Sequence, residues 1–127
     1  MKKTVWCLSL LLVLSFALSL CPSCGKEERG ETVKISFVCV DAGGEERTYG
    51  IVTDRRYLGD ALRDERLIEG RGGQYGTFVT EVCGMRADPD TDGAYWALYV
   101  DGEYSLYGVD STKLKDGSVY SFVYTAL

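Results

Sequence analysis

The chain has 127 residues, with 14 basic residues, 19 acidic residues and no histidine, which gives a net charge of −5. An acidic surface repels nucleic acid, so a nucleic-acid partner is not expected. The lack of histidine excludes Ser-His-Asp catalysis, Cys-His catalysis and histidine-ligated zinc. We therefore predict a protein that is not an enzyme and that has no cofactor and no metal site.

The first 23 residues have the layout of an export signal. Lys2 and Lys3 precede an uncharged apolar run over residues 5–20, which is shorter than the roughly 18 or more residues of a candidate membrane span. Cys24 follows the small residue Ser23, as in a bacterial lipoprotein processing site, so we predict a lipid anchor on Cys24 that holds the protein to the membrane. Cys21 is an alternative acceptor, and simple secretion or an uncleaved anchor is the alternative outcome.

The rest of the chain is expected to work outside the cytoplasm as one small domain. Residues 24–31 are polar and of mixed charge, which predicts a lipid anchor followed by a short tether. Residues 32–127 form the domain. Loss of Lys2 and Lys3 with the signal leaves 12 basic against 19 acidic residues, so this part is more acidic than the whole.

The first half of the domain predicts two strands, one helix and a third strand. Residues 33–40 alternate, with Val33, Ile35, Phe37 and Cys39 on one face, and residues 46–53 form the return strand. Asp54 is expected to cap a short helix whose apolar face holds Leu58, Ala61 and Leu62, and Gly70 is expected to end it in a left-handed conformation. Residues 71–74 then form a loop, and residues 75–82 form the third strand.

The second half predicts an aromatic hairpin and a closing strand. Asp101 and Gly102 suit the positive φ angles of a two-residue hairpin loop, and the closing strand covers residues 118–124. One helix among mostly antiparallel strands predicts an α+β fold.

The loop position sets the register, because Val100 then pairs with Glu103 and Tyr99 lies opposite Tyr104. Both faces of this hairpin are rich in apolar side chains. One face carries Tyr95, Ala97, Tyr99, Tyr104 and Leu106, and the other carries Trp96, Leu98, Val100, Ser105 and Tyr107. One face must pack on the helix; the other is either covered by a neighbouring segment or presents aromatic rings to a partner.

Two further groups of residues leave alternatives open. Cys39 and Cys83 form an even pair in an oxidising compartment, so they are either disulfide-bonded or free buried thiols. Residues 88–93 imitate the start of a calcium loop, but Tyr99 occupies the position of the bidentate glutamate. A solvated acidic loop is the preferred interpretation there.

Several segments in a fixed order resemble a bacterial domain-of-unknown-function family that is similar to the C-terminal domain of transcobalamin and intrinsic factor. The resemblance covers roughly residues 31–127. It is carried by the runs at residues 57–62, 80–84, 95–104, 108–110 and 114–117. It implies a β-grasp-like fold of the soluble-ligand-binding type, with a mixed, mostly antiparallel sheet packed against one short helix.

The resemblance also suggests where a ligand would lie. In the cobalamin carriers, the segments matching residues 95–98 and the turn at Gly108, Val109 and Asp110 border the corrin. A helical barrel domain holds the other side of the ligand there, and this sequence shows none, so a complete cobalamin site is not expected. Two positions depart from the bacterial pattern, because Cys83 and Asp101 stand where asparagine is usual or common.

The functional prediction is a non-catalytic lipoprotein domain outside the cytoplasm that binds a small soluble ligand, such as a corrinoid fragment, through the aromatic hairpin. The alternative is a cell-surface protein-interaction or adhesion module without a small-molecule ligand. The predicted ligand-binding residues are Tyr95, Trp96, Tyr99, Tyr104, Tyr107, Val109 and Asp110.

Overall fold

The computed structural model describes residues 29–127. The predicted signal, Cys24 and most of the predicted tether lie outside the described residues. No helix within residues 29–127 is long and apolar enough to cross a membrane.

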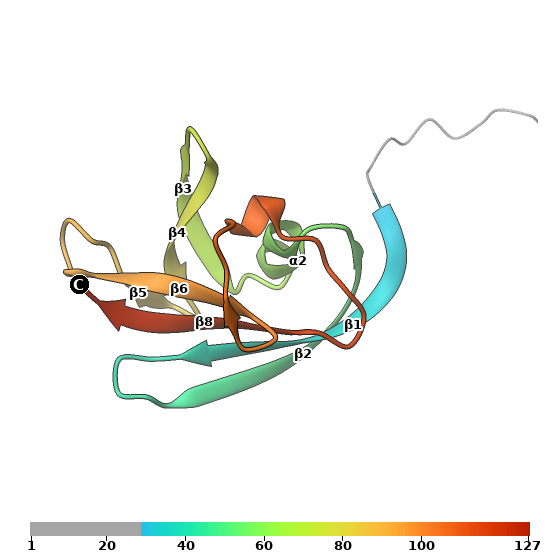
Figure 1. Cartoon of the computed structure of the whole chain (residues 1–127), viewed down its shortest axis with the longest axis horizontal. Helices are drawn as coiled ribbons and strands as arrows, with labels where there is room; N and C mark the ends of the chain where they lie inside the picture. The colour runs from blue at the N-terminus through green and yellow to red at the C-terminus, as the bar shows by residue number, and fades with distance from the viewer. Residues whose placement is uncertain (1–28) are drawn as a thin grey trace, which may run out of the picture.

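A five-stranded sheet forms the base of the domain (Figure 1). Its strands, in spatial order, are β2 (Glu46–Arg55), β1 (Arg29–Val40), β8 (Val119–Ala126), β6 (Ala94–Val100) and β7 (Glu103–Tyr104). β1 and β8 run parallel in the middle, and the other neighbours are antiparallel. The predicted α+β fold with a mixed sheet is confirmed.

A smaller antiparallel sheet and one helix lie on the same side of the large sheet (Figure 1). The small sheet has the order β3 (Ile68–Gly73), β4 (Gly76–Val82) and β5 (Met85–Arg86). The helix is α2 (Leu58–Asp64), and a single 3-10 turn, η1 (Val109–Ser111), lies close to it. One face of the large sheet is therefore covered.

The core follows the alternation of the strands. In β1, Ile35, Phe37 and Cys39 are buried, while the intervening Ser36 and Val38 are only half-buried. Side chains of β2, β6, β8, α2 and the small sheet complete this core: Ile51, Trp96, Leu98, Tyr120, Phe122, Leu58, Leu62, Ile68, Val79 and Val82. Each large apolar side chain removed from water contributes about 1.5–3 kcal/mol, so the covered face of the large sheet carries the stability of the domain.

The predictions of the helix ends are wrong. Asp54 lies within β2 and does not cap α2, whose N-cap position is Tyr57. The helix ends six residues before Gly70, because Arg66 adopts the left-handed conformation with φ 56°. The N–H groups of Arg66 and Leu67 donate to the carbonyls of Arg63 and Leu62. These bonds form a Schellman motif, in which Arg66 occupies the left-handed position that is usually a glycine.

The predicted loop over residues 71–74 is also wrong, because most of it belongs to β3. Its register with β4 shifts between Glu69 and Gly70. A Cβ on Gly70 would collide with the carbonyl oxygen of Phe78. Gly70 is therefore required by the close approach of two strands.

The predicted aromatic hairpin is confirmed in its turn and its register. Asp101 and Gly102 have φ angles of 49° and 83°, as a type I′ turn requires, and Tyr99 pairs with Tyr104. The Asp101 carboxylate also accepts hydrogen bonds from the Val119 N–H at 2.8 Å and the Ser118 hydroxyl at 3.0 Å. The turn is thereby tied to the start of β8.

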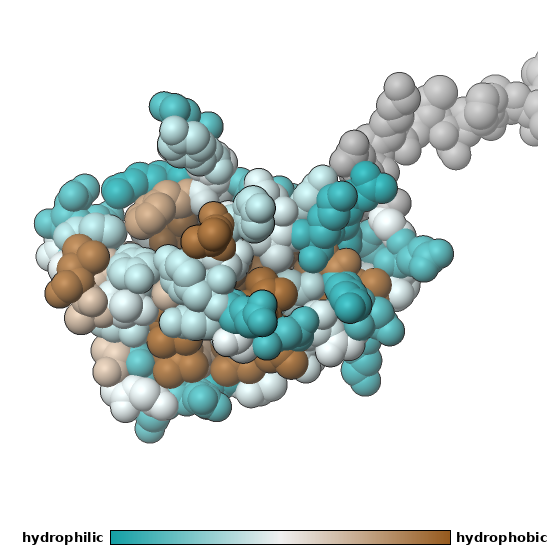
Figure 2. Space-filling model, in the orientation of Figure 1, coloured by the Kyte–Doolittle hydropathy of each residue, from teal (hydrophilic) through white to brown (hydrophobic). Residues whose placement is uncertain are grey.

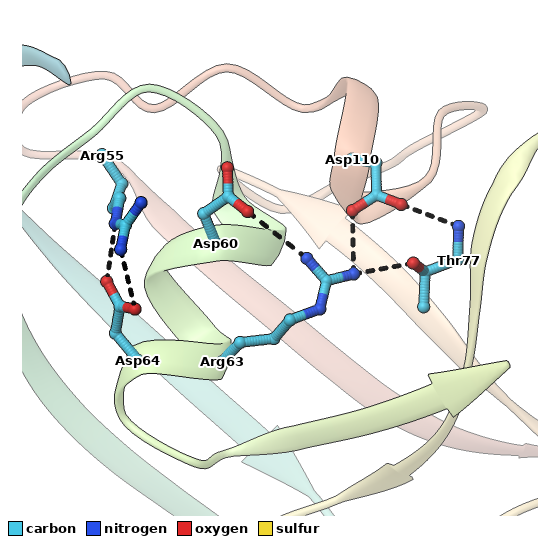
Figure 3. A network of polar contacts seen from close by, with 6 residues as sticks. All are labelled: Arg55, Asp60, Arg63, Asp64, Thr77 and Asp110. Carbon is cyan, nitrogen blue, oxygen red and sulfur yellow. Dashed lines mark hydrogen bonds and ion pairs between the residues drawn. The ribbon is translucent and has the colours of Figure 1, made fainter. Parts of the chain in front are cut away.

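One carboxylate joins three separate parts of the fold (Figure 3). Asp110 in η1 accepts a hydrogen bond from Arg63 of α2 at 2.9 Å and another from the Thr77 N–H of β4 at 2.7 Å. Arg63 in turn donates to the Thr77 hydroxyl at 2.7 Å. This Asp110 cluster fixes the β3–β4 hairpin against the helix and the 3-10 turn.

Two glycines leave room for the Asp110 carboxylate. A Cβ on Gly59 would lie 2.7 Å from one of its oxygens, and a Cβ on Gly76 would lie 3.1 Å from the other. The first distance is far below ordinary contact, and Gly76 also has a φ of 97°. The packing of α2 against η1 thus depends on Gly59.

Replacing Gly59 with alanine is expected to destabilise the domain by about 1–3 kcal/mol, because overpacking displaces the Asp110 carboxylate from its partners. In an unobstructed helix interior the same change stabilises by about 1 kcal/mol. Urea unfolding followed by circular dichroism measures the difference. Gly50→Ala on exposed β2, where nothing lies within 4 Å of the added Cβ, is the control. An increase in stability for Gly59→Ala would contradict the packing described here.

The Asp110 cluster also predicts acid sensitivity. Partial burial alone would raise the pKa of Asp110, but hydrogen bonds from Thr77 and Arg63 outweigh it and hold that pKa below its ordinary value. The stabilisation is therefore complete above about pH 4, the ordinary pKa of aspartate, and is lost as the pH falls through the folded-state pKa.

Asp110→Asn is expected to lower the free energy of unfolding at pH 7 by about 1 kcal/mol or more and to make it less dependent on pH below about pH 5. Some acid sensitivity remains, because hydrogen bonds from the backbone of Asp90 and of Val119 also lower the pKa values of Asp88 and Asp101. Asp60→Asn is the control, since Asp60 only pairs with Arg63 at 3.5 Å on the surface. Equal acid slopes in the wild type and Asp110→Asn would refute this role of Asp110.

Candidate functional site

A groove runs between the edge of β6, the β4 strand and the segment after β7. Its volume is about 230 Å³. Four consecutive β6 residues, Tyr95, Trp96, Ala97 and Leu98, line one side, and Phe78 and Tyr107 are among those on the other sides. We call this site the hairpin groove. Its remaining lining residues are Thr77, Val79, Tyr104, Ser105, Leu106, Gly108, Val109 and Phe122.

The groove lies along a strand edge that has no partner strand. β7 pairs with β6 only at Tyr99 and Val100, and one further bond joins the Ser105 N–H to the Leu98 carbonyl. Backbone groups of alternate residues point to the same edge of a strand, so those of Trp96 point to this edge as well. No strand within residues 29–127 pairs with β6 there. The groove therefore offers unpaired backbone donors and acceptors to a bound molecule.

The structure brings three of the predicted tyrosines together on the uncovered face of the hairpin. The rings of Tyr99 and Tyr104 are 5.7 Å apart in an edge-to-face arrangement. Burial raises the pKa of Tyr95, and so does the neighbouring Tyr104. Tyr95 and Tyr99 are half-buried, whereas 54% of Tyr104 is exposed. These rings are held in place by one another while part of the cluster stays accessible.

Trp96 and Leu98 lie on the opposite, covered face, with 6% exposure each. The Trp96 ring packs edge-to-face on Tyr124 at 5.6 Å. Its buried Nε1–H has no hydrogen-bond partner among the described residues. A buried donor without a partner costs free energy, and within residues 29–127 the Trp96 indole is the one buried side chain with such a donor.

An exposed apolar rim surrounds the groove. Leu106 is 88% exposed and Tyr107 is 71% exposed, and both follow β7 in a segment that is not part of a strand. Figure 2 shows apolar side chains on this face of the molecule beside the β3–β4 hairpin. Large apolar groups gathered at a concave site are typical of binding surfaces.

Leu106 and Tyr107 also line two open hollows next to the groove. One hollow extends toward Lys113 and has a volume of about 620 Å³. The other extends toward Tyr75 at the tip of the β3–β4 hairpin and has a volume of about 550 Å³. The groove alone is smaller than the roughly 300–1,000 Å³ of typical small-molecule sites, but together the hollows give room for a larger molecule.

Two predicted binding residues have mainly internal contacts. Val109 is 1% exposed and belongs to the core, although it lines the groove. Both carboxylate oxygens of Asp110 are engaged by Arg63 and Thr77. Asp110 therefore shapes the site through its neighbours, and its predicted contact with a ligand stays a prediction.

The acidic loop over residues 88–93 is held by internal bonds. Asp88 is buried and accepts bonds from Arg71 at 3.0 Å and from the Asp90 N–H at 2.9 Å. Asp92 accepts a bond from the Asp88 N–H at 2.9 Å. The part of the chain from residue 29 onward contains no group of three or more acidic or cysteine side chains arranged to hold a metal ion.

Sequence reasoning missed Phe78, which lines the hairpin groove, and Tyr75, which lines an adjoining hollow. They come from the β3–β4 hairpin, which was expected to be partly a loop. Phe78 is 40% exposed, and the Arg71 guanidinium lies 5.3 Å from its ring centre. Its position next to β6 depends on the Asp110 cluster, for which the local sequence carries no signal.

The chain belongs to the family described as a domain of unknown function (DUF4430), whose model matches residues 57–126. These residues include α2, the small sheet, the hairpin groove and all of β8. The predicted family resemblance is confirmed. No curated protein matches the chain.

The solved structures that resemble this fold include the following two. A protein from Ruminococcus gnavus ATCC 29149, described as a candidate metal-binding protein, has 28% identity and a TM-score of 0.71; the match covers 75% of this chain and 98% of that one. Haptocorrin, solved in complex with Cbi, has 15% identity and a TM-score of 0.65, and the match covers 83% of this chain. This chain spans 28% of haptocorrin, and at that identity the likeness concerns the fold alone.

Proposed function

We propose that this domain captures a small soluble ligand in the hairpin groove and does not catalyse a reaction on it. The observation that carries the proposal is the exposed apolar rim of Leu106 and Tyr107 next to an unpaired strand edge. Exposing such side chains to water is unfavourable. A bound molecule that covers these side chains would remove their apolar surface from water, and this burial would contribute favourably to the free energy of binding.

The groove favours a ligand with both an apolar or ring-bearing surface and polar groups. Rigid rings such as Tyr104 and Tyr107 offer large contact areas with few rotatable bonds. The backbone of Trp96 at the β6 edge offers a hydrogen-bond donor and an acceptor. This combination of apolar walls and a few directed polar groups is the usual composition of a small-molecule site.

A corrinoid is the first ligand to test. Haptocorrin, which shares the fold, was solved with Cbi, and its likeness supports the choice of probe without identifying the ligand. The groove and its two adjoining hollows are open, so a large molecule could lie across them. Binding by this domain alone would then use only one face of the ligand, and moderate affinity is expected.

We also propose that the domain is held outside the cytoplasm by lipid on Cys24. The support is the charged and apolar start of the chain followed by Ser23 and Cys24. Cys24→Ser is expected to move the protein from the membrane fraction to the soluble fraction and to abolish labelling by a radioactive fatty acid. Cys21→Ser is the control. Loss of the label in Cys21→Ser alone would assign the lipid to Cys21 instead.

Ligand binding is tested by titrating the Trp6→Phe chain with a corrinoid, because Trp96 is then the only tryptophan. We expect saturable quenching of Trp96 emission after correction for absorption by the corrinoid. Leu106→Ser and Tyr107→Ser are expected to weaken binding about tenfold or more, which corresponds to about 1.4 kcal/mol or more per side chain. Quenching that does not saturate would contradict corrinoid binding.

Val52→Ser is the matched control, because Val52 is also exposed, at 64%, but lies on β2 at the far edge of the large sheet. Its affinity should equal that of the wild type. If neither a corrinoid nor a set of other soluble solutes gives saturation, the ligand proposal fails. Recovery of a protein partner that Tyr107→Ser loses without a loss of stability would then favour the interaction module.

A further inference from the structure

We infer that the uncovered face of the large sheet is an interface at which two copies of this chain pack face to face. The helix α2 and the small sheet lie on the other side of the large sheet (Figure 1). The uncovered face is therefore free to contact a second molecule. This inference does not depend on the proposed ligand.

The strand registers show which side chains share this face. Directly paired residues point to the same side of a sheet, and in β1 the buried Ile35, Phe37 and Cys39 alternate with the residues of the uncovered side. We call this set the open face. It consists of Lys34, Ser36, Val38 and Val40 of β1, Glu46, Thr48, Gly50 and Val52 of β2, Val119, Ser121, Val123 and Thr125 of β8, and Tyr95, Ala97, Tyr99 and Tyr104 of β6 and β7. Lys34 and Glu46 are its charged members.

The open face has the composition of an interface between like subunits. Val52 is 64% exposed and Val119 is 37% exposed. Tyr99 and Tyr104 add the edge-to-face ring pair described above. A sheet face that stays in water usually carries polar side chains, whereas charged residues are depleted and tyrosine is enriched at the centres of interfaces. The open face therefore resembles a surface that a protein partner covers.

The shape and size of the open face favour a second copy of the same sheet as that partner. Small-molecule sites are concave, but two sheets of equal twist pack broad face on broad face with their strands about 30° apart. With strands about 4.8 Å apart and a rise of about 3.3 Å per residue, the face measures roughly 20–25 Å by 25 Å. Two copies would bury on the order of 1,000–1,200 Å², the lower limit of a specific interface, so we expect a dissociation constant of micromolar order.

Charge complementarity sets the orientation of the second copy. Lys34 pairs with Val52 near one end of the open face. Glu46 pairs with Val40 near the other end, roughly 20 Å away along the strands. A twofold axis across the strands at the level of Phe37 reverses the second copy end for end, so Lys34 of each copy lies beside Glu46 of the other.

The net negative charge of the chain opposes this association. Two acidic copies repel each other, but the Debye length is about 8 Å at physiological ionic strength. Repulsion between charges far from the interface is therefore largely screened, while the Lys34–Glu46 contacts at its ends are close enough to act.

The test is sedimentation velocity of the full chain in detergent, with micelles in excess over protein and with reductant present. Reductant is needed because Cys39 and Cys83 are free thiols, and a disulfide between copies would mimic the dimer. We expect a shift from monomer to dimer as the protein concentration rises. Lys34→Glu and Glu46→Lys should each weaken the dimer about tenfold or more, because each places like charges side by side at both ends of the interface.

The double variant Lys34→Glu/Glu46→Lys should restore the dimer. Within one copy the two charges are too far apart to interact, so the rescue can only come from contacts between copies. Glu65→Lys is the matched control, because it changes the charge equally at the exposed C-cap of α2 on the covered side of the sheet, and it should not weaken the dimer. Association through a shared micelle would not follow this pattern.

Val119→Lys places a charge in the middle of the open face and should abolish the dimer without loss of the folded circular dichroism spectrum, since this valine is already exposed. A double variant no stronger than the single variants would overturn the inference, as would a wild type that stays monomeric at about 0.5 mM. In the latter case, loss of binding to phosphatidylcholine vesicles on Val119→Lys, with Cys24→Ser in both chains compared, would assign the open face to the membrane instead.

Discussion

The site depends on the position of one carboxylate, that of Asp110. Its two oxygens bind a helix and a hairpin that lie far from Asp110 in the sequence, through Arg63 and the Thr77 N–H. Without these bonds, the β3–β4 hairpin would contact the rest of the domain mainly through the apolar side chains at its base. Phe78 would then have no fixed position beside β6. A polar cluster beside the groove, which includes the lining residue Thr77, thus fixes the position of its wall.

The early end of β7 is the second constraint. A longer β7 would pair with Trp96 and cover the edge of β6, and Leu106 and Tyr107 would then lie on the two faces of a regular ladder. The chain instead leaves the sheet after Tyr104, and the Ser105 hydroxyl accepts a bond from the Tyr107 N–H at 3.1 Å. The same departure creates the unpaired edge and the exposed rim, so the two features of the groove have one structural cause.

The parts of this fold that could be predicted are those determined by local patterns. The alternation in residues 33–40 and the turn at Asp101 and Gly102 placed β1 and the β6–β7 hairpin correctly, because strand faces and positive φ angles depend on neighbouring residues. The helix end was missed because Arg66, which has no preference for the left-handed region, occupies it. The wall of the groove was missed because the contact of Asp110 with Thr77 spans distant parts of the chain.

The polar bonds of the domain are unevenly distributed. Asp88, Asp101 and Asp110 each accept at least two hydrogen bonds, and they fix the loops on which they lie. By contrast, the Trp96 indole N–H and the β6 edge beside it have no partner among residues 29–127. Because most buried polar groups in folded proteins are paired, the groups left over at this groove, together with the exposed apolar side chains that border it, support the groove as the site of the proposed ligand.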